Sequence, residues 1–402
     1  MRRILTCISA LLLAPSSVYA HERFIKHNLR YPIKEEYFHR TADAFLGINP
    51  NMLAIATVSA IVLTAFLAIF FLRQNLDVFV EHRVLRRLHG PAQRFVHHVA
   101  NFLMDQPVRL RWFHVIGEWA VILFLRSPAL VLMFSATNDA LVMPSYPLEP
   151  SSAIYFKFAQ VALAILMLTQ TALPLAGAIV IGTWFYLFRW GWTVAADAIP
   201  VVTVAVLYVT SPWQSHKIAI TDMSATQLRW VRFVLGSGFL ALGWLKIYNY
   251  NLTAAVAQNY PSIMEDPMVG FFSMGTDPAY RMENWVTAFA AAEIMSGFML
   301  MVGVFTRVWG SLMLWVFIKL MLVDFGWDEI PHIYPIAATM AVVFSNKARS
   351  EFAVVERLQQ RAARSGRTGV RIAIIVLASL AISILSIYPL LYLLTFADRS
   401  QL

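Results

Sequence analysis

Long apolar segments separated by short polar connections run through most of this chain. An α-helix rises about 1.5 Å per residue, so about 20 apolar residues suffice to cross the hydrocarbon core of a bilayer. The apolar run at residues 154–188 is too long for one helix, and Gln170, Thr171 and Pro174 predict a turn that divides it. The pattern predicts an all-α, polytopic integral membrane protein with about ten transmembrane helices. These helices cover residues 52–72, 116–134, the two parts of 154–188, 194–210, 231–248, 285–304, 308–323, 332–344 and 372–394.

The N-terminus has the pattern of a secretory signal peptide. A pair of arginines precedes a short apolar run at residues 4–14, and small residues before Ala20 suit signal peptidase. We therefore expect residues 1–20 to be removed, which makes His21 the first residue of the mature chain. An N-terminal histidine offers an amine and an imidazole to one metal ion, and His27 could complete a copper site. The alternative is that cleavage leaves a polar residue with no role in metal binding.

Basic residues concentrate in two of the polar connections. Residues 73–113 hold seven arginines against three acidic residues, and residues 347–371 hold seven basic residues against two acidic ones. Because basic loops stay in the cytoplasm, both connections predict a multi-pass protein of the bacterial inner membrane with a periplasmic mature N-terminus. This topology leaves a parallel internal repeat open, although no residue pattern shared by the halves marks it. The chain then divides into a periplasmic segment at 21–51, five spans at 52–210, a four-helix region at 211–346, and a loop with the final span at 347–402.

Composition agrees with a membrane protein and excludes several kinds of chemistry. The chain is 59% hydrophobic and 14% charged, with a mean hydropathy of +0.61. Its net charge of +9 is explained by the two basic loops, so it does not indicate a nucleic-acid partner. The single cysteine, Cys7, lies in the predicted signal peptide. The mature chain therefore has no thiol for disulfide exchange, an iron–sulfur cluster or nucleophilic catalysis.

Two further features have open interpretations. The first basic connection contains His82, His89 and a His97–His98 pair, which could ligate haem or metal; a basic helix on the membrane surface is favoured because no haem-attachment motif accompanies them. Arg126 lies near the middle of the second predicted span and needs a partner or an aqueous cavity. We favour Asp197 of the fifth span as that partner.

Charged and small residues are regularly spaced over the region 229–346. The first predicted helix there reads Arg232-x3-Gly236-x2-Phe239-x3-Gly243-x2-Lys246, the next contains Glu293-x3-Gly297, and Gly303-x2-Thr306-Arg307 follows. Buried ionisable residues are expensive in a bilayer, at least about 2.5 kcal/mol on the insertion scale, so each predicts a partner or a function. We expect Gly236, Gly243, Gly297, Gly303 and Gly310 to let these helices approach closely, and Arg307 to act as a topological anchor.

This pattern resembles the DoxX group of four-helix membrane proteins, which includes DoxD, the membrane subunit of thiosulfate:quinone oxidoreductase. The resemblance implies a four-helix bundle at about residues 229–346, and a role in electron transfer from sulfur compounds to quinone or in membrane redox complexes. It also implies a periplasmic redox partner. The chain contains no haem motif or flavin fingerprint, so we expect a quinone-interacting subunit or an accessory of such a complex.

The predicted topology gathers charged residues in the outer half of that bundle. Lys246 ends its helix at the outer surface, Glu293 lies about 12 Å inside the start of its helix, and Lys319 about 6 Å inside the end of its own. A lysine or His332 could donate to a quinone carbonyl, while Glu293 or His332 carries the accompanying proton. Arg232, Trp315 and Tyr334 are candidate cofactor contacts, and Asp324, Asp328 and Glu329 form an acidic rim.

Two other interpretations remain. The structural one is that Glu293 forms an ion pair with Lys246 or Lys319 that only holds the helices together. The functional one is a non-enzymatic transporter or a metal-handling or assembly factor, with Pro174, Pro200 and Arg126 on a substrate path.

Overall fold

A computed structural model describes a central part of the chain with short gaps. The described residues are 90–103, 105–138, 140–141, 150–188, 195–196, 198–211, 223–248, 281–303, 305–324 and 332–347. Several predicted features lie outside them: the signal peptide, the spans at 52–72 and 372–394, His21, His27, His82, His89, Asp197, Asp328 and Glu329.

The described residues are all-helical, without strands. The helices are α5 Gly90–Leu103, α6 Arg111–Thr137, α7 Pro150–Thr169, α8 Leu173–Leu187, α10 Ile199–Val209, α11 Ala225–Tyr248, α15 Arg281–Val302, α16 Thr306–Lys319 and α17 Ile333–Phe344, with a π-helical turn η5 at Leu320–Asp324. The predicted division of the long apolar run is confirmed, since α7 ends at Thr169 and Pro174 lies in the first turn of α8. Proline suits that position because the first turn of a helix has no intrahelical use for its N–H.

One described helix is long and apolar enough to cross a membrane. This helix is α6, with 27 residues, and 67% of its most apolar stretch is buried inside the protein. The other apolar stretches in the described ranges have 10–17 residues; they are 153–169, 173–187, 199–209, 289–302 and 333–344. The all-α prediction therefore holds for the described part of the chain, and the number of spans remains a prediction.

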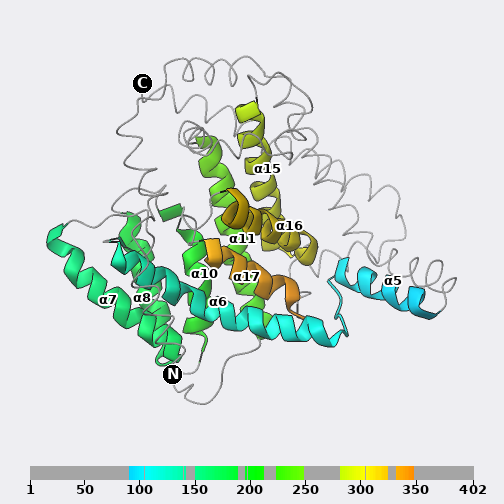
Figure 1. The fold of residues 1–402 in the computed structure, drawn as a ribbon, viewed down its shortest axis with the longest axis horizontal. Helices are drawn as coiled ribbons and strands as arrows, with labels where there is room; N and C mark the ends of the chain where they lie inside the picture. Colours follow the sequence, from blue (N-terminus) through cyan, green and yellow to red (C-terminus); the bar gives the residue numbers. More distant parts are fainter. Residues whose placement is uncertain are drawn as a thin grey trace, which may run out of the picture.

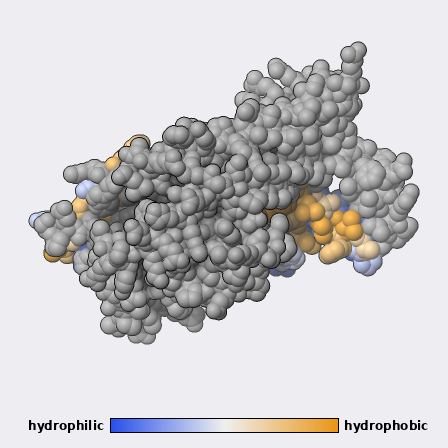
Figure 2. All heavy atoms as spheres, turned by 90° about the horizontal axis from the view of Figure 1, so that it is seen from above, coloured by the Kyte–Doolittle hydropathy of each residue, from blue (hydrophilic) through white to orange (hydrophobic). Residues whose placement is uncertain are grey.

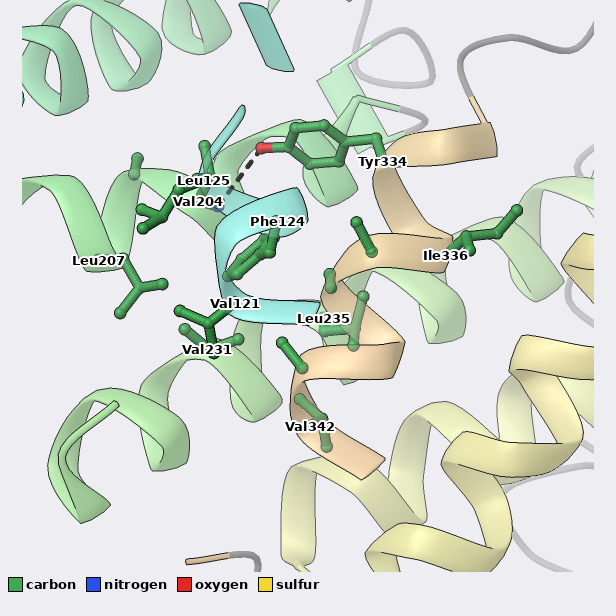
Figure 3. Packing of buried hydrophobic residues seen from close by; sticks show 14 of the residues in the cluster. Val121, Phe124, Leu125, Val204, Leu207, Val231, Leu235, Tyr334, Ile336 and Val342 are labelled. Atoms are coloured by element: carbon green, nitrogen blue, oxygen red, sulfur yellow. Dashed lines mark hydrogen bonds between the residues drawn. The ribbon is translucent and has the colours of Figure 1, made fainter. Parts of the chain in front are cut away.

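The helices enclose one large apolar core. α10, α11 and α17 lie centrally, between α7 and α8 on one side and α15 and α16 on the other (Figure 1). Side chains from α6, α10, α11 and α17 fill the space between them, among them Phe124, Val204, Leu235 and Val342 (Figure 3). The core therefore joins helices from both halves of the sequence.

Two connections in the structure share one backbone conformation. Between α7 and α8, Gln170 and Ala172 have positive φ angles of 56° and 48°; between α15 and α16, Gly303 and Phe305 have φ angles of 84° and 49°. In each connection the second of these residues is the N-cap of the following helix. Positive φ is uncommon outside glycine, so the same pair of positions in two turns is unexpected for unrelated connections.

The packing around these turns also corresponds. When Gln170 is aligned with Gly303 and Ala172 with Phe305, Gly177 of α8 corresponds to Gly310 of α16. A Cβ atom at Gly177 would lie 2.8 Å from Cγ2 of Val209 in α10, and one at Gly310 would lie 2.7 Å from Cγ2 of Val343 in α17. Glycine thus lets α8 pack closely on α10, and it lets α16 pack closely on α17.

The order of helix contacts completes the correspondence. α6 packs on α7 of its own half and on α17 of the other; α11 packs on α15 of its own half and on α10 of the other. The described helices after α5 therefore form two equivalent units, an N-terminal unit of α6, α7, α8 and α10 and a C-terminal unit of α11, α15, α16 and α17. The described helices thus show an internal repeat, and its parallel orientation across a membrane remains a prediction.

Candidate functional site

Close contact between α11 and α15 determines the geometry of the candidate site. α11 begins with a capping box, in which Ser224 Oγ accepts from the Gln227 N–H at 3.1 Å and Gln227 Oε1 accepts from the Ser224 N–H at 2.9 Å. Further along, a Cβ atom at Gly236 would lie 2.5 Å from the Gly297 carbonyl oxygen, and one at Gly243 would lie 2.7 Å from that of Ala290. The predicted close approach through these glycines is confirmed.

A salt bridge joins the two helices one turn beyond Gly243. The ammonium Nζ of Lys246 lies 2.8 Å from Glu293 Oε1 and 2.7 Å from Oε2. The Glu293 side chain is 3% exposed and that of Lys246 is 24% exposed. Lys246, one of the two partners predicted for Glu293, therefore bonds to both carboxylate oxygens of Glu293. Because the carboxylate is buried, removing the lysine would leave a charge that water cannot solvate.

Aromatic side chains connect His332 to the same helix. The His332 ring centroid lies 5.2 Å from that of Phe317 in α16, and the Phe317 centroid lies 5.3 Å from that of Phe239 in α11. Lys319, in the last turn of α16, is half-buried. His332 and Lys319 thus lie on the helices that pack around the pair.

The three predicted cofactor contacts lie in different surroundings. Trp315 is exposed on the outer face of α16. Tyr334 is buried toward α10, where its hydroxyl donates to the Val201 carbonyl. Arg232 is fully buried near the other end of α11, about 21 Å from Lys246 along the helix. A ligand head at the Lys246–Glu293 pair would therefore not touch all three.

Arg232 instead packs against the turn after α15. A Cβ atom at Gly303 would overlap the guanidinium group of the buried Arg232, so a larger residue there would require that side chain to move. The positive φ of 84° at Gly303 also favours glycine. Arg232 and Gly303, two residues of the pattern in the sequence, thus pack against each other.

Arg307 is a buried connecting residue. Its side chain is fully buried and lies over the Phe113 ring, 5.0 Å from the centroid. The guanidinium donates to four backbone carbonyls, those of Asn101, Gln106, Val343 and Ser345. Arg307 therefore does more than the anchor predicted for it, since it ties α16 to the ends of α5 and α17.

Asp105 was not recognised from the sequence. Its carboxylate accepts from the backbone N–H groups of Thr306 at 2.8 Å and Arg307 at 2.9 Å, at the start of α16. A carboxylate at a helix N-terminus satisfies unbonded amides and suits the helix dipole. No local signal could have found this contact, because the partners are about two hundred residues apart in sequence.

Gln160 is a second residue that sequence reasoning missed. It is buried in α7, and its side-chain amide donates to the Ala140 carbonyl at 2.8 Å. When the two turns are aligned, Gln160 falls on the position of Glu293. The N-terminal unit thus carries a neutral amide where the C-terminal unit carries a carboxylate.

Possible metal ligands and similar proteins were both sought. Within the described ranges, no group of three or more His, Cys, Asp or Glu side chains could hold a metal ion. The predicted copper ligands His21 and His27 lie outside those ranges. The chain matches no family model, no curated protein and no solved structure.

Proposed function

We propose that this chain is a multi-pass protein of the bacterial inner membrane that holds a quinone head at the Lys246–Glu293 pair. It would act as a subunit or accessory of a membrane redox complex. The observation that carries the proposal is the burial of this salt bridge between two closely packed helices. A bond that only held the helices together would not require charge, since glycine contacts already join α11 and α15 over two turns.

The pair has the groups that quinone chemistry needs. Reduction of a quinone adds two electrons and two protons, and each carbonyl oxygen becomes a hydroxyl group. The ammonium of Lys246 can donate to a carbonyl oxygen, and Glu293 can accept and pass on a proton at that end of the ring. Lys319 and His332 remain candidates for the second proton. Electrons would come from a periplasmic partner, since the sequence offers no haem or flavin motif.

Apolar side chains on the outside of the bundle support placement in a membrane. Ile154, Phe158, Val161 and Ile165 lie on one face of α7 at helical spacing, and all are exposed. Leu312 and Trp315 of α16 are exposed as well. Large apolar side chains exposed in rows are costly in water and favourable against lipid tails. They favour several membrane-spanning helices in addition to α6.

The proposal is tested by extracting bound small molecules from the detergent-purified protein. We expect the wild type to carry close to one quinone per chain and Glu293→Gln to carry none. The matched control is Gln160→Leu, which disturbs the equivalent buried polar position of the N-terminal unit and should keep the quinone. A Glu293→Gln protein that retains quinone would contradict the proposal, and thermal unfolding of all three would exclude loss through misfolding.

A second function, a non-enzymatic transporter or a metal-handling or assembly factor, is favoured by the two-unit architecture. Transporters are commonly built from repeated units whose substrate site lies between them. On this alternative, the candidate substrate contact is Arg126, which is half-buried in α6 two residues before Pro128. Purified protein that contains a metal ion or a polar solute and no quinone would support this alternative.

A further inference from the structure

The amphipathic helix α5 has one apolar face and one polar face. At about 100° per residue, Ala92, Phe95, Val96, Val99, Phe102 and Leu103 fall on one half of the helix surface. The other half holds Gln93, Arg94, His97, His98 and Asn101. This division is typical of a helix that lies in a boundary between apolar and aqueous surroundings.

Much of the apolar face of α5 is exposed, although Phe102 at its C-terminal end packs against Phe113. None of the residues of α5 is buried, and Phe95 is 69% exposed. Val99 and Leu103, one and two turns further along the same face, are exposed too. Apolar atoms face the viewer in Figure 2 at the end of the molecule where Figure 1 places α5. A row of this kind indicates an interaction surface.

The orientation of α5 is fixed at its C-terminal end. The Asn101 carbonyl accepts from Arg307 Nη1 at 3.3 Å, and Asp105 just beyond α5 caps the start of α16. The segment after α5 is also held to the end of α17, because Val108 N–H donates to Asn346 Oδ1 at 3.0 Å. Three helix ends and α5 therefore meet at one end of the bundle, the level at which α6 begins.

Charge around this end favours an anionic partner. Arg94 on the polar face and Arg109 and Arg111 at the start of α6 are exposed. Asp105 at this junction is buried and its oxygens are taken by backbone amides, so the exposed acid of the described residues near this end is Glu118 of α6, against three exposed arginines. Trp112 and Trp119 of α6 are exposed at the same end, as is common for tryptophan at the level of lipid headgroups.

We infer that α5 lies in the membrane interface, with Phe95, Val99 and Leu103 in the acyl boundary and its basic side against anionic lipid headgroups. The occupant of the apolar face is thus the bilayer itself. The inference rests on the proposed membrane placement, and it is independent of the quinone site. It gives the first basic connection a function beyond topology, which is to bind anionic lipid at the level where α6 and α16 begin and α17 ends.

Spin labels in the full-length protein test this inference. In a Cys7→Ser background, which removes the single cysteine, labels are attached at Phe95→Cys, Val99→Cys and the polar-face control His97→Cys. The protein is placed in nanodiscs of phosphatidylcholine with or without phosphatidylglycerol. We expect collisions with oxygen to exceed those with a water-soluble nickel complex at 95 and 99, and the reverse at 97. Equal values at the three positions would overturn the inference.

A fourth label separates failure of this inference from failure of the membrane placement. Phe158→Cys reports on the exposed apolar face of α7. Oxygen access at 158 together with nickel access at 95 would overturn only the assignment of α5, whereas nickel access at both would overturn the membrane placement. We also expect the label at 95 to lie deeper in anionic discs than in neutral ones, and Arg94→Gln to reduce that difference. Equal depth in both discs would overturn the part played by anionic lipid.

Discussion

At the scale of single residues, buried charge is matched by specific partners at opposite ends of the C-terminal unit. Lys246 bonds to Glu293 near one end, and Arg307 and Asp105 bond to backbone groups near the other. A buried charge that loses its partner costs about 3–5 kcal/mol, so these contacts weigh heavily in the stability of the fold. The two clusters differ in chemistry, because the first pairs ionisable groups with each other and the second uses them to bind main chain.

Asp105→Asn should destabilise the protein by about 1–3 kcal/mol. Asparagine tolerates the positive φ of 55° at this position, but its amide group can accept from only one of the two N–H groups that Asp105 serves. Thermal unfolding in detergent measures the effect. Glu118→Gln, which removes an exposed acid from α6, is the control and should unfold as the wild type does. Equal behaviour of the two variants would show that the cap of α16 contributes little.

Sequence reasoning at this scale succeeded where the signal was local. A carboxylate in an apolar run predicted a buried pair, and Lys246 was one of its two candidate partners. Asp105 was missed because its partners lie far away along the chain. Gln160 was missed because its correspondence to Glu293 appears only when the two units are aligned. Tyr334 and Trp315 carried no signal for the direction in which their rings point.

At the scale of helices, α11 and α15 form the closest contact in the C-terminal unit. A Cβ atom at Gly297 would lie 2.5 Å from the Gly236 carbonyl oxygen and 2.6 Å from the Leu240 nitrogen. Both neighbours are main-chain atoms and cannot rotate away. The separation of the two helices, and with it the distance from Lys246 to Glu293, therefore depends on glycine.

Gly297→Ala should destabilise the protein by about 1–3 kcal/mol, because the added methyl group forces α11 and α15 apart. Gly182→Ala in α8 is the matched control, since a Cβ atom there meets nothing within 4 Å. Alanine is the better helix former, so this control should gain about 0.5–1 kcal/mol. Chemical unfolding of both variants measures the difference. A loss of stability at Gly182 as well would show that glycine matters in these helices for another reason.

At the scale of the whole molecule, two four-helix units share one core, and Tyr334 bonds from one unit to the other. The Tyr334 hydroxyl of α17 donates to the Val201 carbonyl of α10. It also accepts from the Val204 N–H of the same helix at 3.4 Å (Figure 3). Tyr208 of α10 donates to the Leu125 carbonyl of α6. Each hydroxyl thus bonds to the backbone of a neighbouring helix.

Tyr334→Phe should lower the stability of the contact between the units by about 1–3 kcal/mol, because the backbone groups of α10 lose a buried partner. The measurement is thermal unfolding combined with hydrogen exchange, in which α10 should lose protection before α15. Tyr155→Phe, at an exposed position of α7, is the control and should have no effect. Uniform loss of protection over both units would mean that Tyr334 supports the core generally.

The sequence by itself determined the local features of this protein. Apolar runs specified helices, Gln170 and Pro174 specified the turn between α7 and α8, and small residues marked where α11 and α15 approach. These features depend on the length of an apolar run, on backbone preference and on side-chain size, all of which can be read from neighbouring residues.

Only the tertiary structure decided the partners. It placed Lys246 on Glu293, Asp105 on the start of α16, and Tyr334 in α10. It also revealed the repeat, since the corresponding turns share backbone angles and packing without sharing residue types. The physical reason is that the rotation and register of each helix are set by packing against all its neighbours, and a one-residue change in either redirects every side chain on it.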